Sequence, residues 1–322
     1  MSDTIKVIHC VSDGNLPGEQ EIFKPLLDAG IKVDFYHLQS IQDNEKAVIE
    51  AVAGYDYVIA GTENWTRNVF EATRGKLKML VRHGVGMDNV DMDAARELGV
   101  AVSNTPGANA WAVAEHALAM LLGLIRKVSK YDRDIRNGVW KRELSGSLSG
   151  KVGLVGFGAV AQSFAKLLRP FPVEVLAYDI KFNERAAAET GVKYAELDEM
   201  LPQCRVLSIH VPILPETEKF VNDAFIRKMK PDAILINTSR GAVVDEPALI
   251  SALLEQRLAG AALDVFEFEP VAPDNPLLTM DNTILSPHAA NMSIDALRNV
   301  AAQCVANILD YELGREVKYL VN

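Results

Sequence analysis

The stretch KVGLVGFGAVAQSFAKLLRPFPVEVLAYD, residues Lys151 to Asp179, contains the pattern that decides the fold. Its apolar run Val152–Val155 predicts a buried strand, and the residues from Gly156 to Ala161 follow the spacing G-x-G-x-x-A at the start of a helix. In such a turn the first glycine bends the chain, the second lets backbone approach a pyrophosphate, and the small third residue allows close helix–strand packing. The stretch therefore predicts a βαβ unit that binds a dinucleotide at a helix N-terminus.

An acidic residue closes this unit. Asp179 lies about 20 residues after Gly158, at the usual distance of the carboxylate that hydrogen-bonds the adenosine ribose. Because a carboxylate repels a 2′-phosphate, the sequence favours NAD over NADP, although Lys181 nearby weakens that preference. The glycines alone would also fit an ordinary loop; the flanking strand, helix and Asp179 favour the dinucleotide.

On either side of this stretch, short apolar runs alternate with helical patterns, which predicts parallel sheets covered by helices. The expected strands are Ile5–Val11, Ile31–Tyr36, Tyr55–Ala60, Lys78–Val81, Val100–Val102, Val173–Tyr178, Val206–Ile209, Ala233–Ile236, Ala259–Leu263 and Thr283–Leu285. The expected helices are Glu19–Ala29, Asp43–Val52, Thr66–Thr73, Asp91–Leu98, Ala108–Val128, Glu246–Glu255 and Ile294–Leu313.

The chain has 322 residues, which predicts two domains. The last helix and the segment Val317–Val321 need a partner, and a return to the first domain supplies one. We therefore expect an α/β protein with two doubly wound parallel sheets: a Rossmann-type NAD-binding domain at residues 104–291, inserted into a flavodoxin-like substrate domain at residues 1–103 plus 292–322. Ligands of such sheets bind at a cleft, here expected between the domains.

Composition narrows the function classes. The net charge of −10, without a basic cluster, argues against nucleic acid or an anionic membrane as a partner. The cysteines Cys10, Cys204 and Cys304 lack disulfide or metal spacing, so we expect no metal and reduced thiols of a cytoplasmic protein. The start MSDTIKVIHC is not that of a signal peptide.

Three loops of the second half carry reactive side chains. Arg240 follows an apolar strand directly, and its planar fork would grip the carboxylate of an α-oxo acid, although a surface arginine would look the same. If Glu269 contacts His288, the carboxylate would raise the imidazole pKa and keep it a proton donor near neutral pH. This arrangement suits carbonyl reduction by a nicotinamide cofactor.

The other five histidines favour a structural interpretation. They are His9, His37, His83, His116 and His210, placed in or beside expected strands or inside the helix Ala108–Val128. Such a histidine is more often a satisfied structural residue than a catalyst, although His83 and His210 could border the cleft.

Seven ordered motifs make the chain resemble the D-isomer-specific 2-hydroxyacid dehydrogenases, in their phosphoglycerate dehydrogenase-like branch. They are RHGVGMDNVD at Arg82–Asp91, NTPGANAWAVAEHAL at Asn104–Leu118, GLVGFGAVA at Gly153–Ala161, HVPILPET at His210–Thr217, NTSRGAVVDE at Asn237–Glu246, ALDVFEFEP at Ala262–Pro270 and SPHAAN at Ser286–Asn291. The resemblance covers nearly the whole chain and implies an NAD-dependent oxidoreductase that interconverts a D-2-hydroxy acid and its 2-oxo acid.

The resemblance also implies individual roles. Arg240 would bind substrate, Glu269 would be its acidic partner and His288 the acid/base. The expected cofactor-binding residues are Gly156, Gly158, Ala159, Val160, Asp179, His210, Val211, Pro212, Thr217, Thr238, Ser239, Asp264 and Thr105, with Asp264 near the nicotinamide carboxamide. The expected substrate-binding residues besides Arg240 are His83, Gly84, Val85 and Gly86. Family members are generally homodimers, paired through the cofactor domain and the Ala108–Val128 segment.

The substrate stays open at this point. Many phosphoglycerate enzymes carry an arginine after the third strand, where this chain has Gly61–Thr66, and Glu63 would repel a phosphate if it faced the cleft. The chain ends at Asn322 without an added regulatory domain, so phosphoglycerate competes with a smaller or more apolar acid. An NAD-sensing corepressor-like binding protein, or a formate or phosphite dehydrogenase on the same scaffold, are the alternatives.

Overall fold

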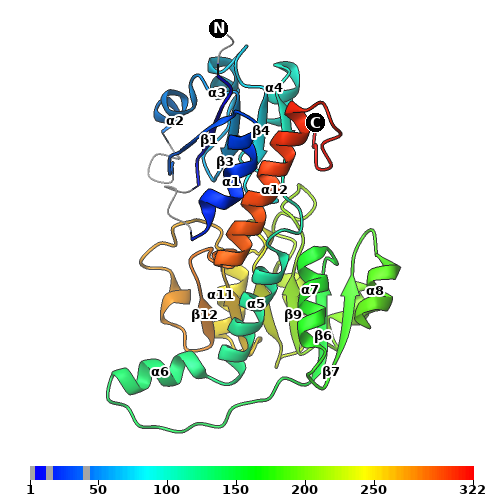
Figure 1. The fold of residues 1–322 in the computed structure, drawn as a ribbon. Helices are drawn as coiled ribbons and strands as arrows, with labels where there is room; N and C mark the ends of the chain where they lie inside the picture. Colours follow the sequence, from blue (N-terminus) through cyan, green and yellow to red (C-terminus); the bar gives the residue numbers. More distant parts are fainter. Residues whose placement is uncertain (1–3, 12–16, 39–43) are drawn as a thin grey trace. The chain divides into compact units, whose positions relative to one another are not determined.

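The chain forms two compact units in the computed structural model, which describes residues 4–11, 17–38 and 44–322 (Figure 1). Met1–Asn109 and Ser293–Asn322 belong to the first unit, and Ala110–Met292 to the second. Asp43, expected to begin a helix, lies outside the described residues. The substrate-binding role of the first unit stays a prediction.

The first unit contains a five-stranded parallel sheet with the order β2-β1-β3-β4-β5. Its strands are β1 (Lys6–His9), β2 (Lys32–Phe35), β3 (Tyr57–Ala60), β4 (Met79–Arg82) and β5 (Ala101–Ser103). Its helices are α1 (Glu19–Asp28), α2 (Glu45–Val52), α3 (Arg67–Ala72), α4 (Met92–Glu97) and α12 (Ile294–Glu312).

Neighbouring residues of a strand point to opposite faces of the sheet. Helices cover both faces here, so both sets of side chains are buried. Ile8 and Val58 belong to a core shared with α2, α3 and α4. Val7 and Ile59 belong to a second core shared with α1 and α12. The C-terminal helix thus covers one face of a sheet whose strands come from the N-terminal part of the chain.

The second unit contains a seven-stranded parallel sheet with the order β12-β11-β10-β9-β6-β7-β8. Its strands are β6 (Gly150–Val155), β7 (Val173–Tyr178), β8 (Lys193–Tyr194), β9 (Val206–Ile209), β10 (Ile234–Asn237), β11 (Gly260–Leu263) and β12 (Thr283–Leu285). Its helices are α5 (Ala110–Ile125), α6 (Val128–Arg136), α7 (Ala159–Leu168), α8 (Glu184–Thr190), α9 (Leu197–Met200), α10 (Asp223–Ile226) and α11 (Glu246–Leu254), with 3-10 turns η2 (Gly241–Val243) and η3 (Pro276–Thr279).

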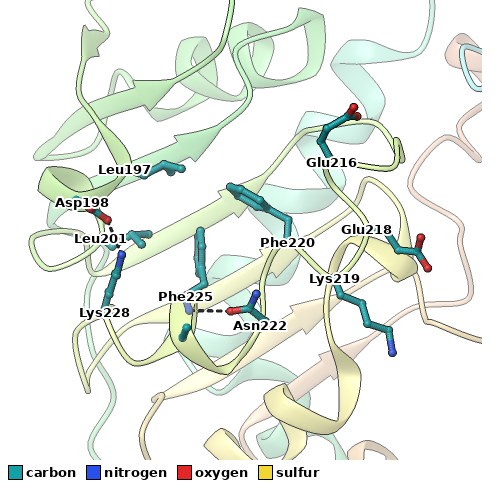
Figure 2. Close-up of a pocket in the computed structure, with 11 residues that line it drawn as sticks. Leu197, Asp198, Leu201, Glu216, Glu218, Lys219, Phe220, Asn222, Phe225 and Lys228 are labelled. Atoms are coloured by element: carbon teal, nitrogen blue, oxygen red, sulfur yellow. Dashed lines mark hydrogen bonds and ion pairs between the residues drawn. The ribbon is translucent and has the colours of Figure 1, made fainter.

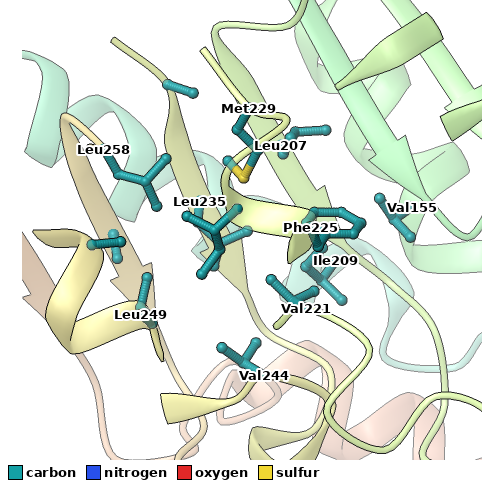
Figure 3. Packing of buried hydrophobic residues seen from close by; sticks show 14 of the residues in the cluster. Val155, Leu207, Ile209, Val221, Phe225, Met229, Leu235, Val244, Leu249 and Leu258 are labelled. Carbon is teal, nitrogen blue, oxygen red and sulfur yellow. The ribbon is translucent and has the colours of Figure 1, made fainter. Parts of the chain in front are cut away.

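Helices cover both faces of this sheet as well. Figure 3 shows one core, in which Leu207 and Leu235 of the sheet pack with Phe225 of α10 and Leu249 of α11. Phe164 of α7 belongs to the opposite core, together with residues of α5. The predicted α/β class with two parallel sheets is confirmed.

The prediction of a single helix at Ala108–Val128 is wrong. Helix α5 ends at Ile125, and α6 begins at Val128 after Lys127 takes a left-handed conformation with φ 56°. Neither glycine nor proline stands at this break, so the sequence carries no local signal for it. Helix α6 buries none of its residues, and the segment after it runs far from the sheet before it reaches β6 (Figure 1).

The chain end closes the edge of the first sheet. Val321 donates its backbone N–H to Val102, and the Asn322 side chain bonds Val102 N–H and the Val100 carbonyl. The three cysteines are buried and form no disulfide. Among residues 4–11, 17–38 and 44–322, no helix has both the length and the apolarity needed to cross a membrane.

Candidate active site

The glycine turn joins β6 to α7 in the conformation that only glycine adopts easily. Gly156 has φ 90°, and a Cβ built there would lie 2.8 Å from the carbonyl oxygen of His210. A Cβ on Gly158 would meet no atom within 4 Å, so open space lies in front of the α7 N-terminus. The turn sits where the strand order reverses, between β6 and β9, which is where ligands of such sheets bind.

Asp179 is held firmly beside this turn. Its Oδ2 accepts the backbone N–H of Phe157 at 2.6 Å, and its Oδ1 accepts the N–H of Lys181 at 2.8 Å. The acidic residue at the end of β7 is thereby fixed next to the glycine turn, with its side chain still partly exposed. A carboxylate in this position can accept ribose hydroxyls.

Two buried polar atoms at the neighbouring strand ends lack a partner among the described residues. They are Nε2 of His210, after β9, and Oγ1 of Thr238, after β10. Burial lowers the pKa of His210 to about 4, so the imidazole is neutral. Since buried polar atoms are normally hydrogen-bonded, these two fit a polar ligand that lies across the strand ends, as a dinucleotide does.

The remaining expected cofactor residues of this unit lie around the same edge. Thr217 closes its loop, because its hydroxyl donates to the Pro212 carbonyl at 2.6 Å and accepts the Leu214 N–H at 2.8 Å. Ser239 donates both its N–H and its hydroxyl to the Asn237 side chain, at 3.0 and 2.8 Å. The others are Ala159 and Val160 at the start of α7, and Val211 after β9.

The reactive side chains predicted from three loops follow three adjacent parallel strands, β10, β11 and β12. Close packing joins the first two loops: a Cβ on Gly241 would lie 1.8 Å from the Phe266 carbonyl oxygen. A side chain at Gly241 would therefore push the loop of Arg240 away from the loop of Glu269. The sequence motif contained this glycine without indicating its neighbour.

His288 and Glu269 form the ion pair that the sequence anticipated. Nδ1 of His288 lies 2.8 Å from Oε2 of Glu269, and Oε1 of Glu269 accepts the Phe266 N–H at 3.0 Å. The hydrogen bond that His288 donates to the Glu269 carboxylate raises the pKa of His288 despite partial burial. Burial works to raise the pKa of Glu269, but its hydrogen bonds to His288 and Phe266 prevail and lower it. The imidazole stays 47% exposed and can reach a ligand.

Arg240 brings a positive charge to this pair. Its charge lowers the pKa of both Glu269 and His288, so the three groups share one electrostatic environment. Its backbone is shaped by Asn237, whose amide donates to the Arg240 carbonyl at 2.9 Å. Asn237 is 1% exposed and organises the whole turn, a role that sequence reasoning missed.

The expected substrate loop lies in the first unit. His83 is buried, and burial above all lowers its pKa to about 3, so this side chain carries no charge. Gly84 has φ 148°, and its carbonyl accepts both the N–H and the hydroxyl of buried Thr105. Val85 is 45% exposed, and Gly86 follows it. The loop is thus fixed by Thr105 and presents its Val85 portion to solvent.

Glu63 points inward, so its charge gives no argument against a phosphate. The side chain is 1% exposed, and its carboxylate accepts the Gly61 N–H and the Trp65 indole N–H. The condition for repulsion, a carboxylate facing the ligand, is not met.

A separate hollow lies elsewhere in the second unit. It has a volume of about 380 Å³ and is lined by residues of α9, α10 and the segment Glu216–Asn222 (Figure 2). An ion pair between Lys228 and Asp198 spans 2.7 Å at its edge. Its described lining includes none of Arg240, Glu269 and His288, so we do not connect it with the chemistry above.

Comparison with known proteins adds independent information. A sequence model described as "D-isomer specific 2-hydroxyacid dehydrogenase, NAD binding domain" matches residues 118–290. The chain is 37% identical over 287 residues to a glyoxylate reductase of Korarchaeum cryptofilum, an alignment that covers 87% of this chain and 86% of that protein.

Two further similarities concern other named activities. A D-3-phosphoglycerate dehydrogenase of Archaeoglobus fulgidus is 36% identical over 283 residues, or 87% of this chain and 54% of that protein, so this chain spans about half the length of that relative. The apo-structure of D-lactate dehydrogenase from Escherichia coli superposes with a TM-score of 0.85 at 27% identity, covering 98% of this chain and 99% of that one.

Proposed function

The chain belongs to the D-isomer specific 2-hydroxyacid dehydrogenase family, and from that premise we propose that Arg240, Glu269 and His288 catalyse the interconversion of a D-2-hydroxy acid and its 2-oxo acid. The family resemblance predicted from the motifs is confirmed, as are an NAD-dependent dehydrogenase activity and NAD as cofactor. The observation that carries the residue roles is the 2.8 Å contact between His288 and Glu269 beside the charge of Arg240.

The cofactor supplies the hydride for carbonyl reduction. The open space before Gly158 and the N-terminus of α7 would hold its pyrophosphate, and Asp179 its adenosine ribose. The polar atoms of His210 and Thr238, which have no hydrogen-bond partner among the described residues, would bond it further along the strand ends. These residues fit NAD, with the fixed carboxylate of Asp179 disfavouring a 2′-phosphate.

The side chains of the three loops would transfer the proton and bind the substrate. Glu269 raises the pKa of His288 and so favours its protonated form, and the exposed imidazole donates its proton to the oxygen of the substrate carbonyl. Arg240 binds the adjacent carboxylate through its fork and polarises the carbonyl. In the oxidative direction the neutral His288 accepts the hydroxyl proton.

We propose a small 2-oxo acid of the glyoxylate type as the substrate. This choice is supported by the glyoxylate reductase relative, which this chain matches over 86% of its length. A phosphorylated acid remains the competing substrate, because Glu63 is buried and does not oppose one. Contacts of substrate with the His83–Gly86 loop, and of cofactor with Thr105, belong to the same proposal.

A substrate panel tests these statements. The purified protein is mixed with NADH and, in turn, glyoxylate, hydroxypyruvate, pyruvate, a branched 2-oxo acid and 3-phosphohydroxypyruvate, and NADH absorbance is followed. Formate and phosphite are tested with NAD in the opposite direction. We expect the highest kcat/KM with glyoxylate or hydroxypyruvate. If only the phosphorylated acid is turned over, the choice of substrate is wrong. If no acid is turned over, the proposed function is wrong.

We also propose a homodimer formed through the NAD-binding unit. Support comes from large apolar side chains exposed on α6 and the segment that follows it: Val128 (58%), Ile135 (53%), Trp140 (86%) and Leu144 (96%). A soluble protein rarely leaves such a group uncovered. Light scattering of the intact protein should give twice the chain mass, and Trp140→Ser with Leu144→Ser should shift it toward one chain mass.

The cytoplasm is the compartment we propose. Three buried thiols without disulfides suit a reducing environment. Fractionation of cells that produce the tagged protein should recover it with a cytoplasmic marker; recovery with a secreted marker would contradict the assignment.

A further inference from the structure

Asp264 anchors the loop that carries His288. The carboxylate follows β11 and is fully buried. It accepts the Ser286 hydroxyl at 2.5 Å and the backbone N–H groups of Ala289 and Ala290 at 2.8 and 2.9 Å. The Asp264 backbone carbonyl accepts the His288 N–H at 2.7 Å. Residues on both sides of the imidazole are therefore bonded to one aspartate.

His116 extends this network to helix α5. Its Nε2 lies 2.8 Å from the Ser286 Oγ and 3.5 Å from the nearer oxygen of Asp264. A serine hydroxyl has one proton to donate, and a carboxylate at 2.5 Å is a stronger acceptor than the Met120 sulfur at 3.6 Å. Ser286 thus donates to Asp264 and accepts from His116, which places a proton on His116 Nε2.

The loop needs such anchoring because His288 adopts a left-handed backbone conformation, with φ 51°. A residue other than glycine keeps that conformation only where its surroundings enforce it. Hydrogen bonds from Ser286, His288, Ala289 and Ala290 to Asp264 supply the constraint.

We propose that His116 and Ser286 are positioning residues which, through Asp264, hold the His288 loop where the imidazole meets Glu269. The proposal rests on the catalytic role of His288 stated above. Neither His116 nor Ser286 touches the reacting atoms in this scheme. His116 lies 170 residues before Ser286 in the chain, so the network ties the His288 loop to the helix with which the unit begins.

The test compares three variants of the full-length protein. His116→Leu removes the donor, His116→Gln keeps an uncharged N–H donor on a side chain of comparable reach, and Glu115→Gln changes the neighbouring exposed residue of α5 as a matched control. Because the network acts on His288, kcat for 2-oxo acid reduction should fall about tenfold in His116→Leu and about threefold or less in His116→Gln. The control should keep the wild-type rate.

Hydrogen exchange supplies a readout that needs neither cofactor nor turnover. The N–H groups of Ala289 and Ala290 are bonded to Asp264, so their exchange should quicken about tenfold in His116→Leu and stay near wild type in Glu115→Gln. Mass spectrometry of a peptide covering residues 286–292 measures this exchange. Unchanged exchange in His116→Leu would overturn the proposal.

The pH profile separates positioning from simple stabilisation. The groups that face His288 are Glu269, Arg240 and Asp264. A displaced loop weakens the contact with Glu269, so the alkaline fall of the reduction rate should move to lower pH in His116→Leu. A lower melting temperature with an unmoved profile would indicate a structural role alone and refute positioning.

A second variant keeps the test decisive if His116→Leu does not fold. Ser286→Ala removes the link itself and should reproduce the rate loss, the faster exchange and the moved profile. Normal values for all three in Ser286→Ala would overturn the proposal. If the wild type reduces no 2-oxo acid, the proposed function fails while the exchange result still decides whether the network holds the loop.

Discussion

Both sheets are parallel, but the side chains at their carboxyl edges differ in exposure. In the first unit, Glu63 and His83 follow β3 and β4 and are 1% and 6% exposed. In the second unit, the side chains of Glu269 and His288 follow β11 and β12 and are 37% and 47% exposed. Both parallel sheets gather polar residues at this edge. The difference teaches that reactivity depends on which polar groups the packing leaves accessible, and less on where the strands end.

The two histidines show the same contrast in their electrostatics. Burial lowers the pKa of His83 to about 3, whereas the hydrogen bond with Glu269 raises the pKa of His288. One imidazole is therefore neutral, and the other keeps its proton to a higher pH than an ordinary histidine does. The following substitutions sharpen or break this contrast, beginning with the largest expected effect.

His288→Asn should lower kcat for 2-oxo acid reduction by about 10²- to 10⁴-fold, because the proton donor is lost. His83→Asn should lower the rate by about tenfold at most and act mainly on thermal stability, since that imidazole is buried. NADH absorbance and thermal unfolding measure the two effects. Equal rate losses in both variants would contradict the proposed difference between the exposed carboxyl edge of the second sheet and the buried carboxyl edge of the first.

Gly241→Ala should destabilise the second unit by about 3 kcal/mol or more, because the new Cβ would lie 1.8 Å from the Phe266 carbonyl oxygen. Gly30→Ala in the first unit meets no atom within 4 Å and carries only the strain of φ 78°, about 1–2 kcal/mol. Urea unfolding followed by circular dichroism compares them. A smaller loss for Gly241→Ala than for Gly30→Ala contradicts the close packing of the two loops.

Arg240→Lys should reduce kcat/KM by about 10- to 100-fold, because an ammonium group cannot form the planar two-point contact with a carboxylate. Arg82→Lys is the matched change at the carboxyl edge of the first sheet, where Arg82 donates a hydrogen bond to the His83 carbonyl. We expect that variant to keep kcat/KM within about threefold. Steady-state kinetics with the best 2-oxo acid compare the two variants. A similar loss of kcat/KM in both would contradict a specific role of Arg240.

Glu269→Gln should lower the reduction rate about tenfold near neutral pH and change its pH dependence. Reduction needs protonated His288, so its rate is high below the raised pKa of His288 and falls as pH rises through it. Removing the carboxylate lets that pKa drop, so the fall should move to lower pH, and the rise of the oxidation rate should move with it. Profiles in both directions that keep their wild-type positions would exclude Glu269 as the cause.

Glu63→Gln should have the smallest effect, about 1 kcal/mol in stability and none on kcat. Burial is the main reason that the pKa of Glu63 is raised. A group with a raised folded-state pKa contributes stability below its unfolded pKa and loses it as pH rises through the folded value. Urea unfolding across pH should therefore show a flatter curve for the variant above the ordinary glutamate pKa, and an unchanged slope would count against this reasoning.

Much of the fold was predictable because buried parallel strands form continuous apolar runs. The strands Val173–Tyr178, Val206–Ile209 and Thr283–Leu285 have the predicted bounds. The two-residue strand β8 and the short helices α9 and α10 were missed, since they are too brief to show a period. The break at Lys127 is a single left-handed residue among ordinary helix formers, so sequence periodicity could not locate it.

The site was predictable only where a motif carried it. The contact between Glu269 and His288 was anticipated as a condition, and the structure shows it, while the catalytic roles stay predictions. His116 was interpreted as a structural histidine, because nothing in a sequence tells which residue 170 positions away a side chain meets. Whether Glu63 faces a ligand was left as a condition, because burial of a carboxylate depends on local hydrogen bonds that only coordinates reveal.

The position of α12 has a consequence for synthesis on the ribosome. This helix follows the whole second unit in the chain, yet its residues Val300, Cys304 and Ile308 belong to one core of the first sheet. Its N-terminus is fixed by Ser293, which accepts the Ala296 N–H at 3.1 Å. While the second unit emerges and folds, only α1 covers that face of the first unit's sheet. Although the first unit is translated first, it is completed last.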